Sequence, residues 1–206
     1  MAQVSDRSDD WKIKRDKVLE TAAKLFAKDG MAAVSMRDVG NASDLHISTL
    51  YYYFPSKSEL YKAVCHWAMH SITMATMDSL HIDGTPIEKI RNYTDSVVRF
   101  LVEEKVATRI LDQHFIFEGG DWDESAYPPI TREPTEKLTR LLETIDPPAL
   151  KEVSSLRLAQ ILWDVIYGIC KFSGIHSAVN RLDHSPLDQA RISGEAWMVV
   201  KGILTA

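Results

Sequence analysis

Apolar residues recur at helical spacing along most of this 206-residue chain, and short polar connections separate the periodic segments. The first such segment covers about residues 10–29, where Val18, Ala22, Leu25 and Phe26 fall at i, i+4, i+7 and i+8 and so share one face of a helix. Glycine and proline are sparse, and strand-like alternation bounded by turn pairs does not occur. We therefore predict an all-α fold.

Two short helices are predicted directly after the first. One begins at Ser35, a good N-cap residue, and turns Val39 and Ala42 inward. After a tight turn the other covers residues 46–54, and Pro55 ends it because the residue before a proline avoids helical geometry. A long helix followed by two short helices with a tight turn between them is typical of a helix-turn-helix unit.

The rest of the chain is also predicted to be helical. Ser56 caps a long fourth helix, Thr85-Pro86 opens a fifth, and Ser185-Pro186 caps the last. Further helices are expected over about residues 106–117, 131–145 and 154–180, with a loop over residues 118–129. We therefore expect a three-helix helix-turn-helix domain over residues 1–60 and a larger C-terminal helical bundle over residues 61–206.

The second short helix is the one expected to enter DNA. A major groove about 12 Å wide admits one helix, and the helix before it holds it at a fixed angle against the backbone. Its buried side is predicted to hold Leu45, Leu50 and Phe54. Its outer side holds His46, Ser48, Thr49, Tyr51 and Tyr53.

Three sequence blocks in this region resemble the DNA-binding domain of the TetR (tetracycline repressor) family. They are AAKLF at residues 22–26, SMRDV at residues 35–39 and TLYYYFPSKSEL at residues 49–60. The resemblance covers about residues 13–64. It implies a homodimeric DNA-binding transcriptional regulator, a repressor, that binds a pseudo-palindromic double-stranded operator and is released by a small-molecule effector in its C-terminal bundle.

The resemblance also implies roles for single residues. Arg37, Ile47, Ser48 and Thr49 match positions that touch base edges, and Arg37 can read guanine because its guanidinium pairs with O6 and N7. The positions of phosphate and groove contacts are matched by Tyr51, Tyr53 and Lys57, while Tyr52 is expected to pack inward.

The chain departs from the family's pattern at three positions. Asp44 stands where the turn commonly has glycine, and aspartate tolerates left-handed geometry better than most residues. His46 replaces a small capping serine, and Ser48 replaces a frequent glycine. Because the last two alter the groove-facing surface, the operator of a relative cannot be assumed here.

A basic segment near the N-terminus offers further phosphate contacts. Lys12, Lys14, Arg15 and Lys17 lie close together, but acidic residues are interleaved with them. A solvated first helix is the alternative interpretation.

The C-terminal bundle holds the candidate effector pocket and dimer interface. A small-molecule site needs apolar walls with a few polar groups, and the candidates are Trp67, Phe100, Gln113, His114, Phe117, Trp163 and Tyr167. Small residues recur every fourth position in the last helix, which favours close approach of a partner helix. The candidate dimer residues are Gly174, Ala190, Gly194, Met198 and Gly202. Core packing is the alternative for both sets.

Composition narrows the function classes. The net charge of −5 excludes a protein that coats nucleic acid through bulk charge, although residues 1–62 carry +1 and the remainder −6. No signal peptide or membrane span is recognised, and the cysteines Cys65 and Cys170 suit a reducing compartment, so we expect a cytoplasmic protein.

No catalytic or phosphate-binding motif is found, so we expect neither an enzyme nor a bound cofactor. His66 and His70 share a helical face but lack a third ligand, and no metal site is expected. Two alternatives stay open. One is a small-molecule binding protein whose DNA function has decayed, and the other is a helical-bundle enzyme.

Overall fold

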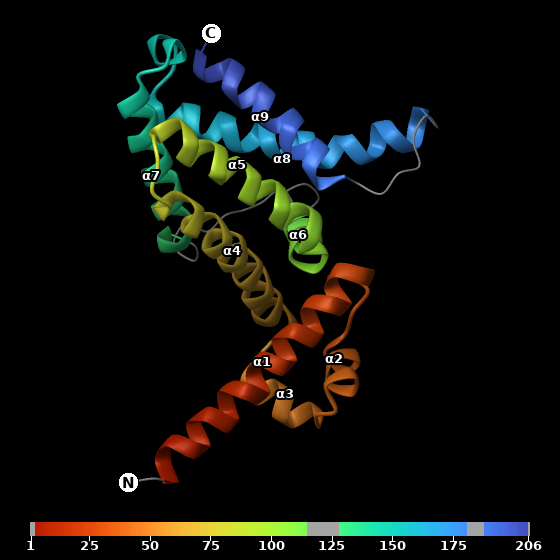
Figure 1. Cartoon of the computed structure of the whole chain (residues 1–206). Helices are drawn as coiled ribbons and strands as arrows, with labels where there is room; N and C mark the ends of the chain where they lie inside the picture. The colour runs from red at the N-terminus through yellow and green to blue at the C-terminus, as the bar shows by residue number, and fades with distance from the viewer. Residues whose placement is uncertain (1–2, 115–127, 181–187, 206) are drawn as a thin grey trace. The chain divides into compact units, whose positions relative to one another are not determined.

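A computed structural model of the chain describes residues 3–114, 128–180 and 188–205, and every regular element within these ranges is a helix (Figure 1). The predicted all-α fold is therefore confirmed. The helices are α1 (Gln3–Asp29), α2 (Met36–Ser43), α3 (Ile47–Tyr53), α4 (Lys57–His81), α5 (Pro86–Glu103), α6 (Lys105–Asp112), α7 (Pro128–Ile145), α8 (Ser155–Asn180) and α9 (Gln189–Thr205), with a short 3₁₀ helix, η2 (Pro148–Lys151).

Local capping accounts for several helix starts. The Ser35 hydroxyl accepts a hydrogen bond from the Asp38 N–H at 3.2 Å, and the Asp38 carboxylate accepts one from the Ser35 N–H at 2.8 Å. Thr85 and Glu88 form the same reciprocal pair at the start of α5. The predicted starts of α2 and α5 are thus confirmed. The capping segment Ser185-Pro186 and the loop over residues 118–127 lie outside the described residues.

Two helices begin earlier than predicted. α1 starts at Gln3 instead of residue 10, and α7 starts at Pro128 instead of residue 131. Proline is compatible with a first helical turn because the N–H it lacks would have no intrahelical partner there. For α1, no apolar stripe marks the added residues, so the sequence pattern alone missed them.

The helices pack into two compact units. The first contains residues 3–69 and 106–114 of the described chain, and the second contains residues 70–105, 128–180 and 188–205. The predicted division at residues 60 and 61 concerns the roles of the two parts and stays a prediction. None of the described helices is both long and apolar enough to span a membrane.

The first unit is built on the apolar stripe of α1. Val18, Ala22 and Phe26 are fully buried, and α2 packs on α1 while α3 packs on α2. Leu50 of α3 and Phe54, which follows it, are also buried. The predicted buried side of the third helix is therefore confirmed for these two residues, and Leu45 is half-buried.

Two residues predicted to face inward are exposed. In α2 the inward face is taken by Met36, Val39, Gly40 and Ser43, and Ala42 lies on the other side of the helix. In α3 Tyr52 is 74% exposed. Since each helical residue is rotated by about 100° from the last, a residue two positions from both Leu50 and Phe54 points away from them.

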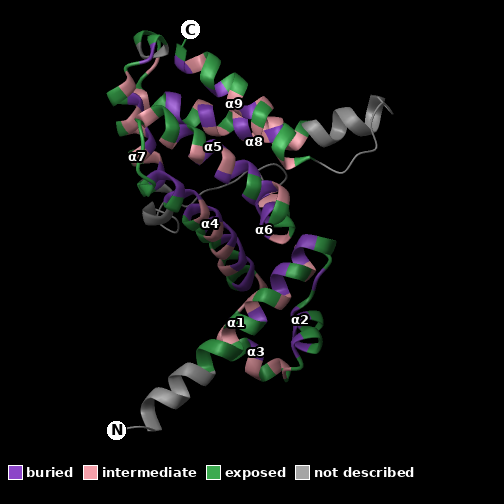
Figure 2. Ribbon diagram, viewed as in Figure 1, coloured by how far each residue is buried: buried purple, intermediate pink, exposed green. Residues whose placement is uncertain are grey.

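The second unit is a bundle in which α5, α7, α8 and α9 pack in pairs. Its buried side chains recur with helical spacing, and Figure 2 shows buried stretches alternating with exposed ones along α5, α8 and α9. Its fully buried large side chains are Ile90, Leu138, Leu142, Leu158, Leu162, Ile166 and Ile192. This apolar core stabilises the packing of the helices in the second unit without a disulfide among its described residues.

Candidate nucleic-acid interface

The turn between α2 and α3 depends on a left-handed residue. Asp44 has φ 57° and ψ 44°, and its N–H donates to the Asn41 carbonyl oxygen at 3.3 Å. The N–H of Leu45 donates to the Gly40 carbonyl oxygen at 2.9 Å. Aspartate thus takes the left-handed geometry where family members commonly have glycine, and the turn is made without loss of its hydrogen bonds.

Gly40 allows this turn to lie close to α2. A Cβ atom built on Gly40 would stand 3.3 Å from the Leu45 carbonyl oxygen and 3.8 Å from Leu50 Cδ2. The nearest atom belongs to backbone that the turn hydrogen bond already holds. Gly40 was not among the predicted functional residues, although a glycine inside a short helix was the available signal.

His46 caps the recognition helix α3. Its Nδ1 lies 2.8 Å from Ser48 Oγ and accepts a hydrogen bond from the Ser48 N–H at 3.4 Å. An Nδ1 that accepts implies a proton on Nε2, so the exposed edge of the ring offers a donor. The two departures at positions 46 and 48 therefore form one hydrogen-bonded pair on the outer surface.

The outer face of α3 carries most of the predicted DNA contacts. His46, Ser48 and Tyr51 are exposed, and Ile47, Thr49 and Tyr53 are half-buried. Tyr52 belongs to this exposed surface as well. On α2, Arg37 is exposed and has no hydrogen bond or ion pair within the described residues.

Lys57 is engaged with the protein itself. Its ammonium donates to the Met31 carbonyl oxygen at 3.0 Å and to the Ala32 carbonyl oxygen at 3.5 Å. Because a lysine has three donors, one remains for a phosphate. Lys57 therefore fixes the connection after α1 and keeps one N–H donor for another acceptor.

An aromatic cluster joins α1 to the end of α3. The rings of Trp11 and Tyr53 lie 5.7 Å apart, and the Arg15 guanidinium stands 5.9 Å from the centre of the Trp11 ring and 5.1 Å from that of Phe54. Arg15 also lies 3.8 Å from an Asp16 carboxylate oxygen. Its guanidinium thus packs on two aromatic rings, whereas Lys12 and Lys17 are exposed.

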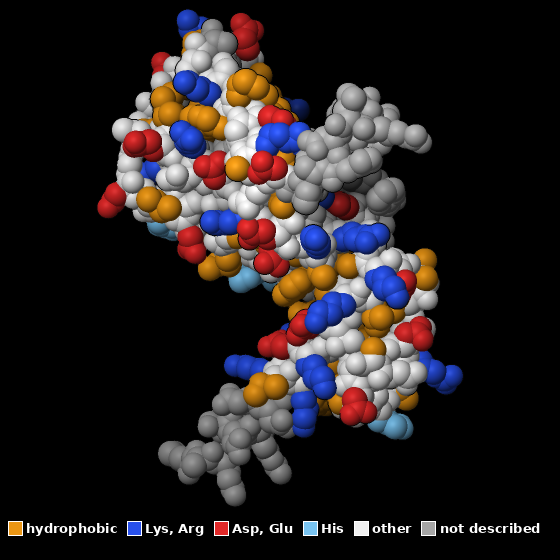
Figure 3. Space-filling model, turned by 45° about the vertical axis from the view of Figure 1, so that its right-hand side comes forward, with side chains coloured by type: hydrophobic (Ala, Val, Ile, Leu, Met, Phe, Trp, Pro, Cys, Tyr) orange, Lys and Arg blue, Asp and Glu red, His pale blue; other side chains and the backbone are white. Residues whose placement is uncertain are grey.

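The charge of the first unit is mixed on the face shown in Figure 3, where Lys and Arg side chains alternate with Asp and Glu. This agrees with the net charge of +1 for residues 1–62. We therefore expect contacts to DNA to come from individually placed cations such as Arg37, which is exposed.

The predicted effector residues are divided between the two units. Trp67, Gln113 and His114 lie in the first, whereas Phe100, Trp163 and Tyr167 lie in the second. Phe117 lies outside the described residues. A pocket shared by all seven stays a prediction.

Contacts within each unit engage several members of this set. Gln113 Nε2 donates to the Ala27 carbonyl oxygen at 3.4 Å, and the His114 ring lies 6.3 Å from that of Tyr61. In the second unit Trp163 stacks on Tyr167 at 6.1 Å, and Lys171 Nζ stands 5.1 Å from the Tyr167 ring centre. Ordinary packing therefore accounts for part of the set.

The predicted dimer stripe is exposed along α9. Ala190, Gly194, Met198 and Gly202 are all exposed, and Met198 is 67% exposed. A Cβ at Gly194 or Gly202 would meet nothing within 4 Å, so neither glycine is needed for packing inside the described protomer. Gly174 lies in the part of α8 where burial is not described.

The structure does not assemble the histidines of α4 into a metal site within the described residues. His66 and His70 are both exposed on α4, and the described residues contain no group of three His, Cys, Asp or Glu side chains placed to hold a metal ion.

Known proteins share both the sequence pattern and the fold. The sequence model of the family described as "Bacterial regulatory proteins, tetR family" matches residues 18–64. The HTH-type transcriptional repressor KstR of Mycolicibacterium smegmatis is 27% identical over 104 residues, and the match covers 50% of this chain and 51% of the repressor. The chain thus spans about half the length of this curated relative.

Two solved structures show the same fold over nearly the whole chain. A tetR family transcription regulator from Shewanella sp. PV-4 matches with a TM-score of 0.71 at 12% identity, over 94% of this chain and 98% of that one. AibR, solved with isovaleryl coenzyme A and operator DNA, matches with a TM-score of 0.66 at 17% identity, over 90% and 97% of the two chains.

Proposed function

The chain belongs to the tetR family of bacterial regulatory proteins, and we propose on this basis that it is a ligand-responsive transcriptional repressor. The observation that carries the proposal is the exposed outer face of α3, with His46, Ser48 and Tyr51 in solvent and the opposite side buried. AibR, whose fold is similar, was solved on operator DNA, and this supports the same role for the matching helix.

We divide the DNA contacts by chemistry. Arg37, Ile47, Ser48 and Thr49 read base edges, and the Nε2–H of His46 adds a donor beside them. Tyr51, Tyr53 and the third N–H of Lys57 bind phosphates. The support for Arg37 is its unengaged guanidinium, which can pair bidentately with guanine.

The protein acts as a homodimer that joins through the exposed stripe of α9. The same surface patch on two protomers makes a two-fold interface. Two recognition helices related in this way lie roughly 34 Å apart and bind a pseudo-palindromic operator. In this scheme residues 1–60 bind DNA, and residues 61–206 hold the effector and the dimer interface.

A small molecule in the C-terminal bundle controls DNA binding. The support is the isovaleryl coenzyme A in the AibR complex and the repressor role of KstR. A ligand that binds one dimer geometry better shifts operator affinity by its coupling energy, typically about 1–3 kcal/mol. The protein works in the cytoplasm and has no catalytic activity of its own.

Selection from a random pool of DNA duplexes at near-physiological salt tests the proposal. We expect the purified protein to recover one inverted repeat. Arg37→Ala should bind the recovered site more weakly, whereas Arg99→Ala, which removes an exposed cation from α5, should bind it normally.

If protein that has been refolded without ligand still recovers no sequence from the pool, a DNA-binding role is contradicted. That result would favour a binding protein whose DNA function has decayed. Sequence-blind retention that falls steeply with salt would equally contradict a specific repressor.

A further inference from the structure

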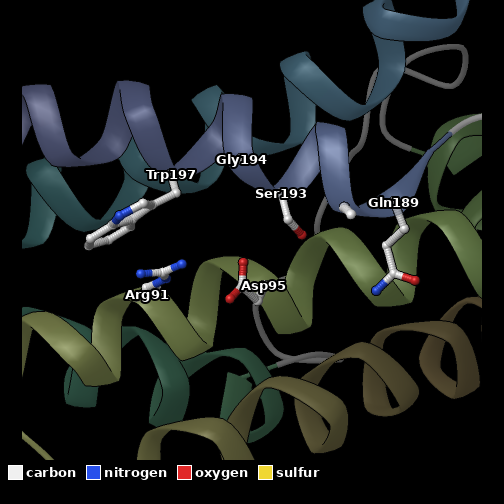
Figure 4. A pocket seen from close by; sticks show the side chains of 7 residues that line it. Arg91, Asp95, Gln189, Ser193, Gly194 and Trp197 are labelled. Atoms are coloured by element: carbon white, nitrogen blue, oxygen red, sulfur yellow. The ribbon is translucent and has the colours of Figure 1, made fainter.

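A hollow of about 330 Å³ opens between α5 and α9, two helices that pack together within the second unit (Figure 4). Arg91 and Asp95 line it from α5, and Gln189, Ser193 and Trp197 line it from α9. None of these residues belongs to the set predicted to bind the effector. The hollow is therefore separate from that predicted site.

Arg91 and Asp95 carry opposite charges one helical turn apart, yet they do not form an ion pair. Other pairs at this spacing do so, such as Lys24 with Glu20 at 2.6 Å. The Arg91 guanidinium instead stands 5.7 Å from the centre of the Trp197 ring, and this contact holds it away from Asp95. Neither charged group has a hydrogen bond or ion pair within the part of the chain that the structure describes.

The other polar groups around the hollow can serve a ligand of mixed charge. Figure 4 shows the Ser193 hydroxyl and the Gln189 amide both turned toward α5, the helix that carries Arg91 and Asp95. A hydroxyl and a primary amide can each donate and accept hydrogen bonds. On the α9 side the walls include Ala190 and Gly194, and a Cβ at Gly194 would meet nothing within 4 Å. The space is thus open because these two side chains are small.

We propose that this hollow binds a small zwitterion of the α-amino acid type. Its carboxylate binds the Arg91 guanidinium, its ammonium group binds the half-buried Asp95 carboxylate, and Ser193 and Gln189 hydrogen-bond to the same charged groups. The volume lies at the lower end of the range for small-molecule sites, roughly 300–1,000 Å³. It suits a metabolite of amino-acid size and not a coenzyme A thioester.

The rival occupant of the hollow is the partner protomer of the homodimer proposed above. Ala190 and Gly194 also belong to the exposed stripe of α9, so a partner helix on that stripe reaches the edge of the hollow. If the partner helix enters the hollow, it contacts Arg91 and Asp95, and loss of either charge would weaken the dimer. The measurement must separate these two occupants.

Titration of the full-length protein with L-leucine, followed by ligand-observed NMR, tests the proposal. We expect dissociation constants on the order of millimolar, because ion pairs at an open site are weak. Arg91→Met and Asp95→Asn should each weaken binding by up to about 5-fold, the loss of one exposed ion pair. Arg99→Met, which removes an exposed cation from another part of α5, should bind leucine normally.

Two leucine analogues test the need for both charges. 4-Methylpentanoate lacks the ammonium group and 3-methylbutylamine lacks the carboxylate, so each should bind more weakly than leucine. Equal binding of either analogue, unchanged binding of leucine by Arg91→Met, or no binding at all would overturn the proposal.

The oligomeric state of the same variants, measured by sedimentation, tests whether a second copy of the chain occupies the hollow. If Arg91→Met and Asp95→Asn dissociate the dimer while leucine does not bind, the hollow belongs to the dimer interface. None of these measurements contains DNA, so the outcome is independent of whether the protein proves to be a repressor.

Discussion

The guanidinium of Arg15 lies 5.1 Å from the centre of the Phe54 ring, and this contact ties α1 to the residue that ends the recognition helix. Phe54 is 3% exposed, and its N–H donates to the Leu50 carbonyl oxygen at 2.9 Å. This cation–π contact and the tilted packing of Trp11 against Tyr53 make the orientation of α3 depend on α1 as well as on α2.

Loss of this cation–π contact should be measurable as loss of stability. Arg15→Ala is expected to lower the free energy of unfolding by about 1 kcal/mol, a typical value for a partly exposed cation on an aromatic ring. Urea denaturation measures it, with Lys12→Ala as the matched change of an exposed cation on the same helix. If Arg15→Ala keeps its stability but lowers the salt dependence of DNA binding by one phosphate contact, Arg15 binds DNA instead.

Substitution of Arg37 and substitution of Tyr51 should weaken DNA binding in different ways. Arg37→Ala is expected to relax preference at one base position at a cost of about 1–3 kcal/mol, because a bidentate contact to guanine is lost. Tyr51→Ala is expected to weaken binding to all sequences alike, because a phosphate contact carries no sequence information. Affinities for the recovered operator and its single-base variants distinguish the two. Equal loss of every base preference in Arg37→Ala would refute this division.

Gly40 and Gly168 should respond oppositely to the same substitution. Gly40→Ala places a Cβ 3.3 Å from a backbone oxygen of the turn, and we expect it to destabilise the protein. Gly168→Ala adds a Cβ in open space within α8, and we expect a gain of roughly 0.5–1 kcal/mol from helix propensity. Thermal and urea denaturation of both variants measure the signs. A stable Gly40→Ala would show that the turn can shift.

Acid should weaken the start of α2. Hydrogen bonds from the Ser35 hydroxyl and N–H hold the pKa of the Asp38 carboxyl below its ordinary value of 3.8. A carboxyl whose pKa is lower in the folded protein stabilises it fully above the unfolded value, and this stability is lost as the pH falls through the folded value. The free energy of unfolding, measured from pH 6 to pH 2, should therefore fall more steeply for the native protein than for Asp38→Asn. Parallel curves would mean that the capping box contributes nothing.

The thiols should be unreactive in the folded protein. Burial raises the pKa of Cys170 to about 11, and Cys65 is buried. At pH 8 only about one Cys170 thiol in a thousand is then the reactive thiolate. Iodoacetamide is expected to modify both residues quickly only after unfolding, as measured by mass spectrometry. Fast modification of Cys170 in the native protein would show that α8 opens there.

Much of the local structure in both units could be predicted from the sequence. Ser35 and Thr85 cap helices through residues three positions away, and the α1 stripe shows in the spacing of Val18, Ala22 and Phe26. The exposed positions of His46, Ser48 and Tyr51 follow from the helical period alone. Tyr52 was predicted wrongly although the helical period turns it away from Leu50 and Phe54. Ala42 was predicted wrongly because the inward face of a two-turn helix depends on which neighbour covers it.

The candidate effector set was less predictable. Trp67, Gln113 and His114 fall in one compact unit, whereas Phe100, Trp163 and Tyr167 fall in the other. Helical spacing identifies which side of a helix is apolar but does not say which helix it meets. Residues that belong to a pocket therefore cannot be separated from core residues before the helices are placed.

The sequence by itself determined most of the helices, the caps at Ser35 and Thr85 and the exposure of His46, Ser48 and Tyr51, since these depend on residues within about one helical turn of each other. Only the tertiary structure decided that Arg15 packs on Phe54, that Lys57 binds the Met31 carbonyl oxygen and that Gly40 admits the turn. The first two contacts join residues 39 and 26 positions apart. Such contacts form because separate helices compete for the same buried space, and no local pattern records which of them meet.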